Sequence, residues 1–337
     1  MLATVLTAAA MLTLRGDVLF STGTPAQLRV VDVVTGHVRR LTHDRDAYGG
    51  ATWSPDGRRI AVSVSGPNKK GAIELLDARG RVRRVLSDGA FWDSEPAWSP
   101  DGRRLAFVRQ PANPGGYHGE QLELMVINAD GSGLTQLTHT TSQKHFLSWS
   151  PDGSRVVFTA SRILHSWVAD VDTARGDDRL LVDNAYEATW APDGTRIAYV
   201  QGLPKGPEVV VANPDGSNPH VVAAAHWTRA VEAPTWSPDG RWIAYAFGGV
   251  NIAQIWLEAV HPDGTGAHRL TGIRGHSDWA PSWSPDGRGV TFVRHTFRRT
   301  PRSAYVAVVQ LDGKRLRVFD DTRSVWGESE TAPAWRP

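Results

Sequence analysis

A five-residue phrase, Trp-Ser-Pro-Asp-Gly, recurs through this chain of 337 residues and restricts its fold more than any other feature. Complete copies begin at Trp53, Trp98, Trp149, Trp236 and Trp283. A variant with alanine in second place begins at Trp190, and a truncated copy, Trp335-Arg336-Pro337, ends the sequence. Successive tryptophans are 41 to 52 residues apart, a period typical of β-propeller blades. The phrase therefore predicts an all-β propeller.

Each repeat predicts four short strands. Proline and glycine make the phrase a tight turn, because proline presets φ and glycine accepts the positive φ that ends such a turn. The segments after the turn, such as residues 60–64 and 105–108, are β-rich and apolar on both faces, which suits strands between neighbouring blades. We expect the aspartate of each turn to form the turn rather than to act as a catalytic acid.

The number of blades follows from the two ends of the repeat series. Residues 17–42 supply three strands with no tryptophan phrase before them, and residues 332–337 supply a first strand with nothing after it. Joined, these pieces make one composite blade and remove the open sheet edges. Seven blades are therefore predicted; the alternative is six blades with a loose N-terminal extension.

Composition excludes several classes of protein. Apolar residues are 41% and charged residues 21% of the chain, as in ordinary globular proteins. The net charge is +2 with no dense basic stripe, so nucleic acid is not a predicted partner. Cysteine is absent, which excludes disulfides, cysteine ligands and a cysteine nucleophile. We predict no metal and no cofactor, and a monomer.

The N-terminal segment is apolar. Residues 1–14 carry no charge and resemble the apolar region of a secretory signal, but they are too few to span a bilayer. We interpret residues 1–15 as a truncated signal or an apolar extension, and residues 16–337 as a single propeller domain. The first interpretation predicts export to the periplasm or cell exterior; otherwise the protein is expected in the cytoplasm.

The extended repeat, Pro-x-Trp-Ser-Pro-Asp-Gly-x-x-Ile/Leu-Ala, as in residues 96–106, resembles the TolB-type propeller repeat, which is related in shape to WD-repeat propellers. The resemblance covers residues 17–337 and implies a binding or scaffolding protein, often exported. Two features depart from TolB, which has an additional N-terminal domain and six blades. Similar propellers precede prolyl-oligopeptidase-type hydrolase domains, but this sequence contains no Gly-x-Ser-x-Gly motif.

Candidate binding residues lie just before the tryptophan of each repeat. In a propeller these loops gather at one mouth of the central channel, on the face opposite the Ser-Pro-Asp-Gly turns. The predicted ligand-binding residues are Tyr48, Trp92, Glu95, Phe146, Tyr186, Glu187, Trp227, Glu232, Trp279 and Trp326. Aromatic faces beside carboxylates suit a cationic or sugar-like ligand. Alternatively, the aromatic side chains cap blade packing and the acids solvate the rim.

These residues allow two functions. The first is a binding or scaffold protein for a protein or cell-envelope partner. The alternative is an enzyme, a hydrolase, lyase or natural-product-modifying enzyme, that uses acid–base groups at the same mouth. The candidate catalytic residues are then Glu95, His145, Glu187, Glu232 and Glu330.

Basic residues in the loops between second and third strands predict an outer basic sector on the mouth face, which could dock an anionic partner. They are Lys69, Lys70, Arg109, Arg162, Lys205 and the arginines of residues 294–302.

Overall fold

The computed structural model describes residues 14–23, 25–67, 69–87, 89–110, 121–163, 165–225, 229–249, 254–272, 275–296, 303–324 and 333–337. Within these ranges the chain forms strands, turns and bends and no helix. The absence of a helix there means that no described segment is a membrane-spanning helix. Residues 1–13 lie outside the described residues, so the predicted signal segment stays a prediction.

The strands fall into seven groups of four along the chain. The composite group contains β28 (Ala334–Trp335), β1 (Asp17–Thr22), β2 (Gln27–Asp32) and β3 (Val38–Arg40). The second and third contain β4 (Ala47–Trp53), β5 (Arg59–Gly66), β6 (Lys69–Asp77), β7 (Val82–Val85), β8 (Trp92–Trp98), β9 (Arg104–Gln110), β10 (Glu123–Asn128) and β11 (Thr135–Gln136). The fourth and fifth contain β12 (Gln143–Trp149), β13 (Arg155–Arg162), β14 (His165–Asp172), β15 (Asp178–Asp183), β16 (Ala185–Trp190), β17 (Ile197–Gln201), β18 (Glu208–Ala212) and β19 (His220–Ala224). The last two contain β20 (Arg229–Trp236), β21 (Ile243–Gly249), β22 (Ile255–Val260), β23 (His268–Arg269), β24 (His276–Trp283), β25 (Gly289–Thr296), β26 (Ser303–Gln310) and β27 (Arg317–Ser324).

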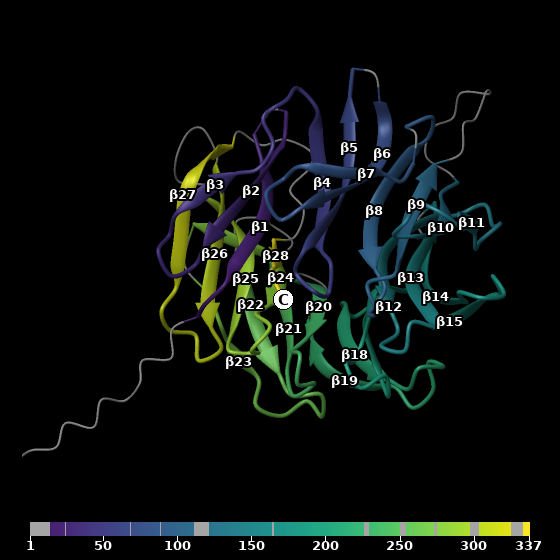
Figure 1. The fold of residues 1–337 in the computed structure, drawn as a ribbon. Coiled ribbons are helices and arrows are strands. Elements are labelled where there is room, and N and C mark those ends of the chain that lie inside the picture. Colours follow the sequence, from purple (N-terminus) through teal and green to yellow (C-terminus); the bar gives the residue numbers. More distant parts are fainter. Residues whose placement is uncertain are drawn as a thin grey trace, which may run out of the picture.

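Each group is an antiparallel sheet whose strands pair in chain order, apart from the composite group. There, β28 pairs with β1 through Val18↔Trp335 and Leu19↔Ala334, giving the order β28-β1-β2-β3. The last strand of the chain thus closes the sheet begun by the first, as Figure 1 shows beside the C-terminal label. The predicted composite blade is confirmed.

The first strands of successive groups contact one another in a closed ring: β4, β8, β12, β16, β20, β24, β28 and again β4. Figure 1 shows the groups following each other around the molecule in colour order. The fold is therefore a seven-bladed β-propeller, as predicted, and not the six-bladed alternative.

The repeated tryptophans join neighbouring blades. The indole Nε1 of Trp149 donates a hydrogen bond of 3.0 Å to the carbonyl of Ala97 in the preceding blade, and Trp283 does the same to Thr235. The guanidinium of Arg104, also from the preceding blade, lies 5.1 Å from the Trp149 ring centroid. The phrase that punctuates the sequence is therefore an inter-blade contact as well as a turn.

The turn aspartates serve the turns. Ser99 Oγ donates to Asp101 Oδ1 at 2.6 Å and the Arg103 amide donates to the same oxygen at 3.0 Å. These bonds, the serine one first, hold the pKa of Asp101 below its usual value. Gly102 follows with a φ of 66°, which glycine adopts without steric cost.

Candidate functional site

A β-bulge interrupts the first strand of six blades, three residues before the tryptophan. Pairing between first and second strands shifts register there. The residue at the bulge has φ between 51° and 60°, and the six are Gly50, Glu95, Phe146, Glu187, Ala233 and Ala280. Five are not glycine, although this conformation disfavours side chains. The recurring tryptophan marks this position in the sequence, but the residue types there do not predict a bulge.

The bulge decides which side chains face the channel. In β8, β12, β16, β20 and β24, residues two and five positions before the tryptophan are mostly buried, whereas residues three and four before it are partly exposed. Glu95, His145, Tyr186, Glu187 and Glu232 all occupy the partly exposed positions. The structure therefore places these predicted residues along the inner strands of the ring.

Glu95 connects two blades. Its Oε2 accepts a 3.0 Å hydrogen bond from the backbone N–H of Phe146, the bulge residue of the next blade. Its Oε1 lies 2.7 Å from His145 Nδ1. This hydrogen bond raises the pKa of His145, against the opposing effect of burial. Because these two hydrogen bonds fix the Glu95 carboxylate, Glu95 has a structural role and links its blade to the next one.

Glu187 occupies the equivalent bulge position and forms the equivalent hydrogen bond to the next blade. Its Oε2 accepts a 2.5 Å hydrogen bond from the backbone N–H of Ala233, the next bulge residue. Burial raises the pKa of Glu187 to about 7; the Ala233 hydrogen bond opposes this, and the charge of Glu232 adds to it. A carboxyl with this pKa is partly protonated at neutral pH.

Tyr186, Glu187 and Glu232 together form what we call the acidic site. Burial raises the pKa of Glu232. Burial and the charges of both glutamates raise the pKa of Tyr186 to about 12. Within the described part of the chain, no lysine, arginine or histidine forms an ion pair with either glutamate. These two carboxyl groups thus have no cationic partner in the part of the chain that the structure describes.

The predicted aromatic residues divide into three kinds. Trp92 and Phe146 are about half exposed, at 52% and 53%. Tyr186 and Trp279 are partly buried against blade cores. Tyr48 was predicted to bind ligand, but it is 3% exposed in the core and its hydroxyl donates to Asp44 at 2.6 Å. It lies five residues before its tryptophan, on the side of the strand that faces the core.

Three predicted residues, Trp227, Trp326 and Glu330, lie outside the described residues.

Four members of the predicted outer basic sector pair with acidic neighbours. The pairs are Arg109 with Asp93, Arg294 with Asp278, Lys69 with Glu74 and Lys205 with Glu208, at 2.6–2.7 Å. Each carboxylate is itself buried, so each cation compensates a charge removed from water. Residues 297–302 lie outside the described residues.

Lys144 is a buried cation that sequence reasoning missed. Its side chain is fully buried; its ammonium donates to the carbonyls of Leu122 and Thr140 at 2.6 and 3.0 Å and lies 3.3 Å from Glu123. Burial lowers its pKa. Its position five residues before Trp149 matches that of Asp93 and Tyr48, which face the core, so Lys144 serves packing.

Among the residues that the structure describes, no group of three or more histidine, aspartate or glutamate side chains is arranged to hold a metal ion. The acid–base groups described along the inner strands are the Glu95–His145 pair and the acidic site.

Seven antiparallel blades closed by their terminal strands, with ionisable residues along the inner strands, define a β-propeller of the tryptophan-repeat kind. A family model for the TolB beta propeller domain matches residues 26–246. The chain belongs to this TolB β-propeller family.

Solved structures with the same fold include TolB proteins and enzymes. An oligogalacturonate lyase from Vibrio parahaemolyticus matches with a TM-score of 0.66 at 13% identity, over 90% of this chain and 86% of that one. TolB from Acinetobacter baumannii matches with a TM-score of 0.58 at 17% identity, over 96% and 80%. A puromycin-hydrolyzing peptidase from Mycobacterium tuberculosis gives 0.68 at 14%, over 94% of this chain but 55% of the peptidase. At these identities the likeness establishes the fold alone.

Proposed function

We propose that this propeller is a binding protein that captures a positively charged segment of a protein or cell-envelope partner at the acidic site. The observation that carries the proposal is the pair of Glu187 and Glu232, whose pKa values are both raised and which have no cationic partner among the described residues. A lysine, arginine or amino terminus entering the channel would supply the missing charge. The half-exposed aromatic rings of Trp92 and Phe146 add surface on which apolar or cationic groups can stack.

Peptide capture tests the proposal. The immobilised protein is offered an array of decapeptides that share one backbone composition and carry three lysines, no charge or three glutamates. We expect retention of the lysine peptides, and a loss of about tenfold in Glu232→Gln and in Glu187→Gln, since a hydrogen bond to a charged group contributes about 1.5–3 kcal/mol. Glutamine at position 187 keeps an acceptor for the Ala233 amide, so the blade contact survives.

Asp177→Asn is the matched control, because Asp177 is exposed and lies in the turn between β14 and β15, away from the inner strands. Equal retention by wild type, both glutamine variants and the control would refute a role for the acidic site. Retention of the uncharged peptides at the same level would refute its charge preference.

A second function is favoured by one specific observation, the pKa of about 7 at Glu187. A carboxyl that exchanges its proton near neutral pH, beside a second carboxyl, meets the requirement for a general acid or base in a hydrolase or lyase. A substrate panel of neutral and uronic oligosaccharides and of peptides would be assayed with wild type, Glu187→Gln and Glu232→Gln. Turnover that is unchanged in both variants would remove these residues from any mechanism.

Export remains a prediction from the apolar residues 1–14. Fractionation of cells that express the complete chain, with and without residues 2–14, tests it: release of only the complete chain from the cytoplasm supports an export signal.

A further inference from the structure

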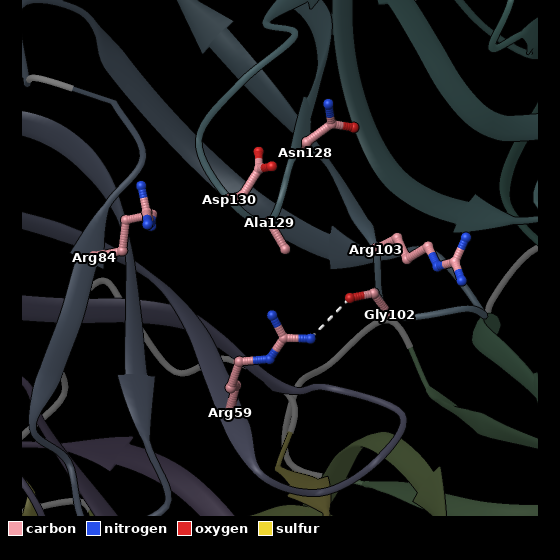
Figure 2. Close-up of a pocket in the computed structure, with 7 residues that line it drawn as sticks. All are labelled: Arg59, Arg84, Gly102, Arg103, Asn128, Ala129 and Asp130. Carbon is pink, nitrogen blue, oxygen red and sulfur yellow. Dashed lines mark hydrogen bonds between the residues drawn. The ribbon is translucent and has the colours of Figure 1, made fainter.

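The face that carries the Ser-Pro-Asp-Gly turns contains a cavity of about 540 Å³ between the second and third blades. Its lining residues are Arg59, Arg84, Gly102, Arg103, Asn128, Ala129 and Asp130. They come from β5, β7, the turn before β9, the last residue of β10 and the turn that follows it (Figure 2). Three arginines around one hollow form a feature that the repeat pattern did not predict.

One of these guanidinium groups is fixed in place. Arg59 Nη2 donates a 2.9 Å hydrogen bond to the carbonyl of Gly102, and its guanidinium lies 4.7 Å from the centroid of the Trp98 ring. This leaves its remaining N–H groups to face the hollow, as Figure 2 shows. A donor that is already ordered loses little conformational entropy when it binds a ligand.

The other two arginines are exposed and have no ion-pair partner within 4.0 Å among the described residues. Arg84 belongs to the outermost strand β7 and reaches toward the turn at Gly131. Arg103 follows the third-blade turn, and its side chain makes no hydrogen bond within the described chain. Both are free to engage a ligand.

The single carboxylate of the cavity is committed to its own turn. Asp130 Oδ1 accepts the Ser132 hydroxyl at 2.6 Å and the Ser132 amide at 2.9 Å. Three guanidinium groups against one carboxylate leave a formal charge of +2. A carboxylate ligand would neutralise only half of this charge, whereas a phosphate monoester carries about −1.5 to −2 at neutral pH and three acceptor oxygens.

We propose that this cavity binds a phosphate monoester, held by Arg59, Arg84 and Arg103. This open hollow is larger than phosphate alone, so it leaves room beside the phosphate for the organic part of an ester. The corresponding place in the next two blades lacks the charge, because Ser154 and Thr195 stand where Arg103 stands relative to the tryptophan. Arginine does recur at this repeat position as Arg58, Arg241 and Arg288, so the site is defined by the combination of Arg103 with Arg59 and Arg84 around one cavity.

Titration of the complete protein with glycerol 3-phosphate, followed by calorimetry at low and moderate salt, tests the proposal. We expect saturable binding that weakens with salt, and at least about tenfold weaker binding in Arg84→Ala and in Arg103→Ala, since each removes a charge-assisted hydrogen bond. Arg288→Ala is the matched control, because Arg288 has the same place in its repeat, is exposed and lies outside the cavity. Asp130→Asn is expected to tighten binding, a gain that misfolding cannot produce.

Titrations with acetate and with phosphatidic acid vesicles distinguish a soluble phosphate monoester from a carboxylate and from a lipid headgroup. Binding of glycerol 3-phosphate in preference to acetate supports a soluble monoester, and binding of phosphatidic acid vesicles but not of the soluble ester supports the same phosphate on a lipid headgroup. The proposal is overturned if neither binds, if acetate binds as tightly, or if Arg288→Ala weakens binding as much as Arg84→Ala does.

Discussion

The two faces of the propeller differ in the sign of the charged groups that have no ion-pair partner among the described residues. On the mouth face, cations in loops are paired with buried carboxylates, as Arg294 is with Asp278, whereas Glu187 and Glu232 have no cationic partner within the described part of the chain. On the turn face, aspartates such as Asp101 and Asp130 accept hydrogen bonds from their own turns. Buried Asp170 pairs there with Arg155 and Arg179, but Arg84 and Arg103 have no ion pair in the ranges that the structure describes. The charge of a face therefore depends on the ionisable groups that remain unpaired after folding, and not on the charged residues counted in the sequence.

The largest test of this comparison breaks a mouth-face pair. Arg294 and Asp278 have side chains only 4% and 1% exposed and form two hydrogen bonds of 2.7 and 2.8 Å. Arg294→Ala leaves a buried carboxylate alone, so we expect the free energy of unfolding to fall by about 3–5 kcal/mol. Urea denaturation at pH 7 measures it.

The matched change on the turn face is Arg241→Ala, which removes an 80% exposed arginine 4.0 Å from Asp239. We expect its effect to stay within about 0.5 kcal/mol, as for most exposed ion pairs. Equal losses in the two variants would contradict the distinction between buried, structural cations at the mouth and exposed cations at the turns.

The second test uses pH. The pKa of Glu187 is raised in the folded protein, to about 7 from 4.5, so the folded state holds this proton more tightly. The stability it contributes is complete below about pH 4.5 and is lost as the pH rises through 7. The turn aspartates have lowered pKa values, as Asp101 does, so their contribution is lost instead as the pH falls below their ordinary range.

Unfolding free energies of wild type and Glu187→Gln at pH 5 and pH 8 separate these effects, because other titrating groups cancel in the difference. We expect wild type to lose on the order of 2 kcal/mol more than the variant between the two pH values. Parallel pH profiles would show that Glu187 ionises normally. Capture of lysine peptides is expected to strengthen over the same interval, because ionised Glu187 attracts them.

The sequence was sufficient for the architecture because its signal repeats. Residues 17–42 supply three strands of a blade and the segment around Trp335 supplies the fourth, so their pairing through Val18 could be predicted. Side-chain roles were harder to predict. Tyr48 and Tyr186 precede their tryptophans by five and four residues, and that one-residue difference puts one ring in the core and the other along the channel.

The missed features all depend on contacts between distant residues. Glu95 and Phe146 meet only because successive blades align their bulges. Arg59, Arg84 and Arg103 surround one cavity only because a turn of the third blade faces the outer strand of the second. A period in the sequence specifies the blades, but it does not specify which side chains of adjacent blades face each other.

The smallest test concerns backbone strain, where the two ends of each first strand also differ. The turn end places glycine at its positive φ, as in Gly102 and Gly287, whereas the channel end places alanine there in Ala280, with a φ of 52°. Ala280→Gly relieves this conformation, and we expect a gain of about 0.5–1 kcal/mol in stability after the greater entropy of unfolded glycine is subtracted. Ala97→Gly, at a first-strand position without positive φ, is the control and should lose about the same amount. Loss of stability in both variants would mean that the Ala280 methyl group has a packing role that outweighs the strain. Side-chain contacts would then stabilise the bulge in this blade, as they do at Glu95 and Glu187.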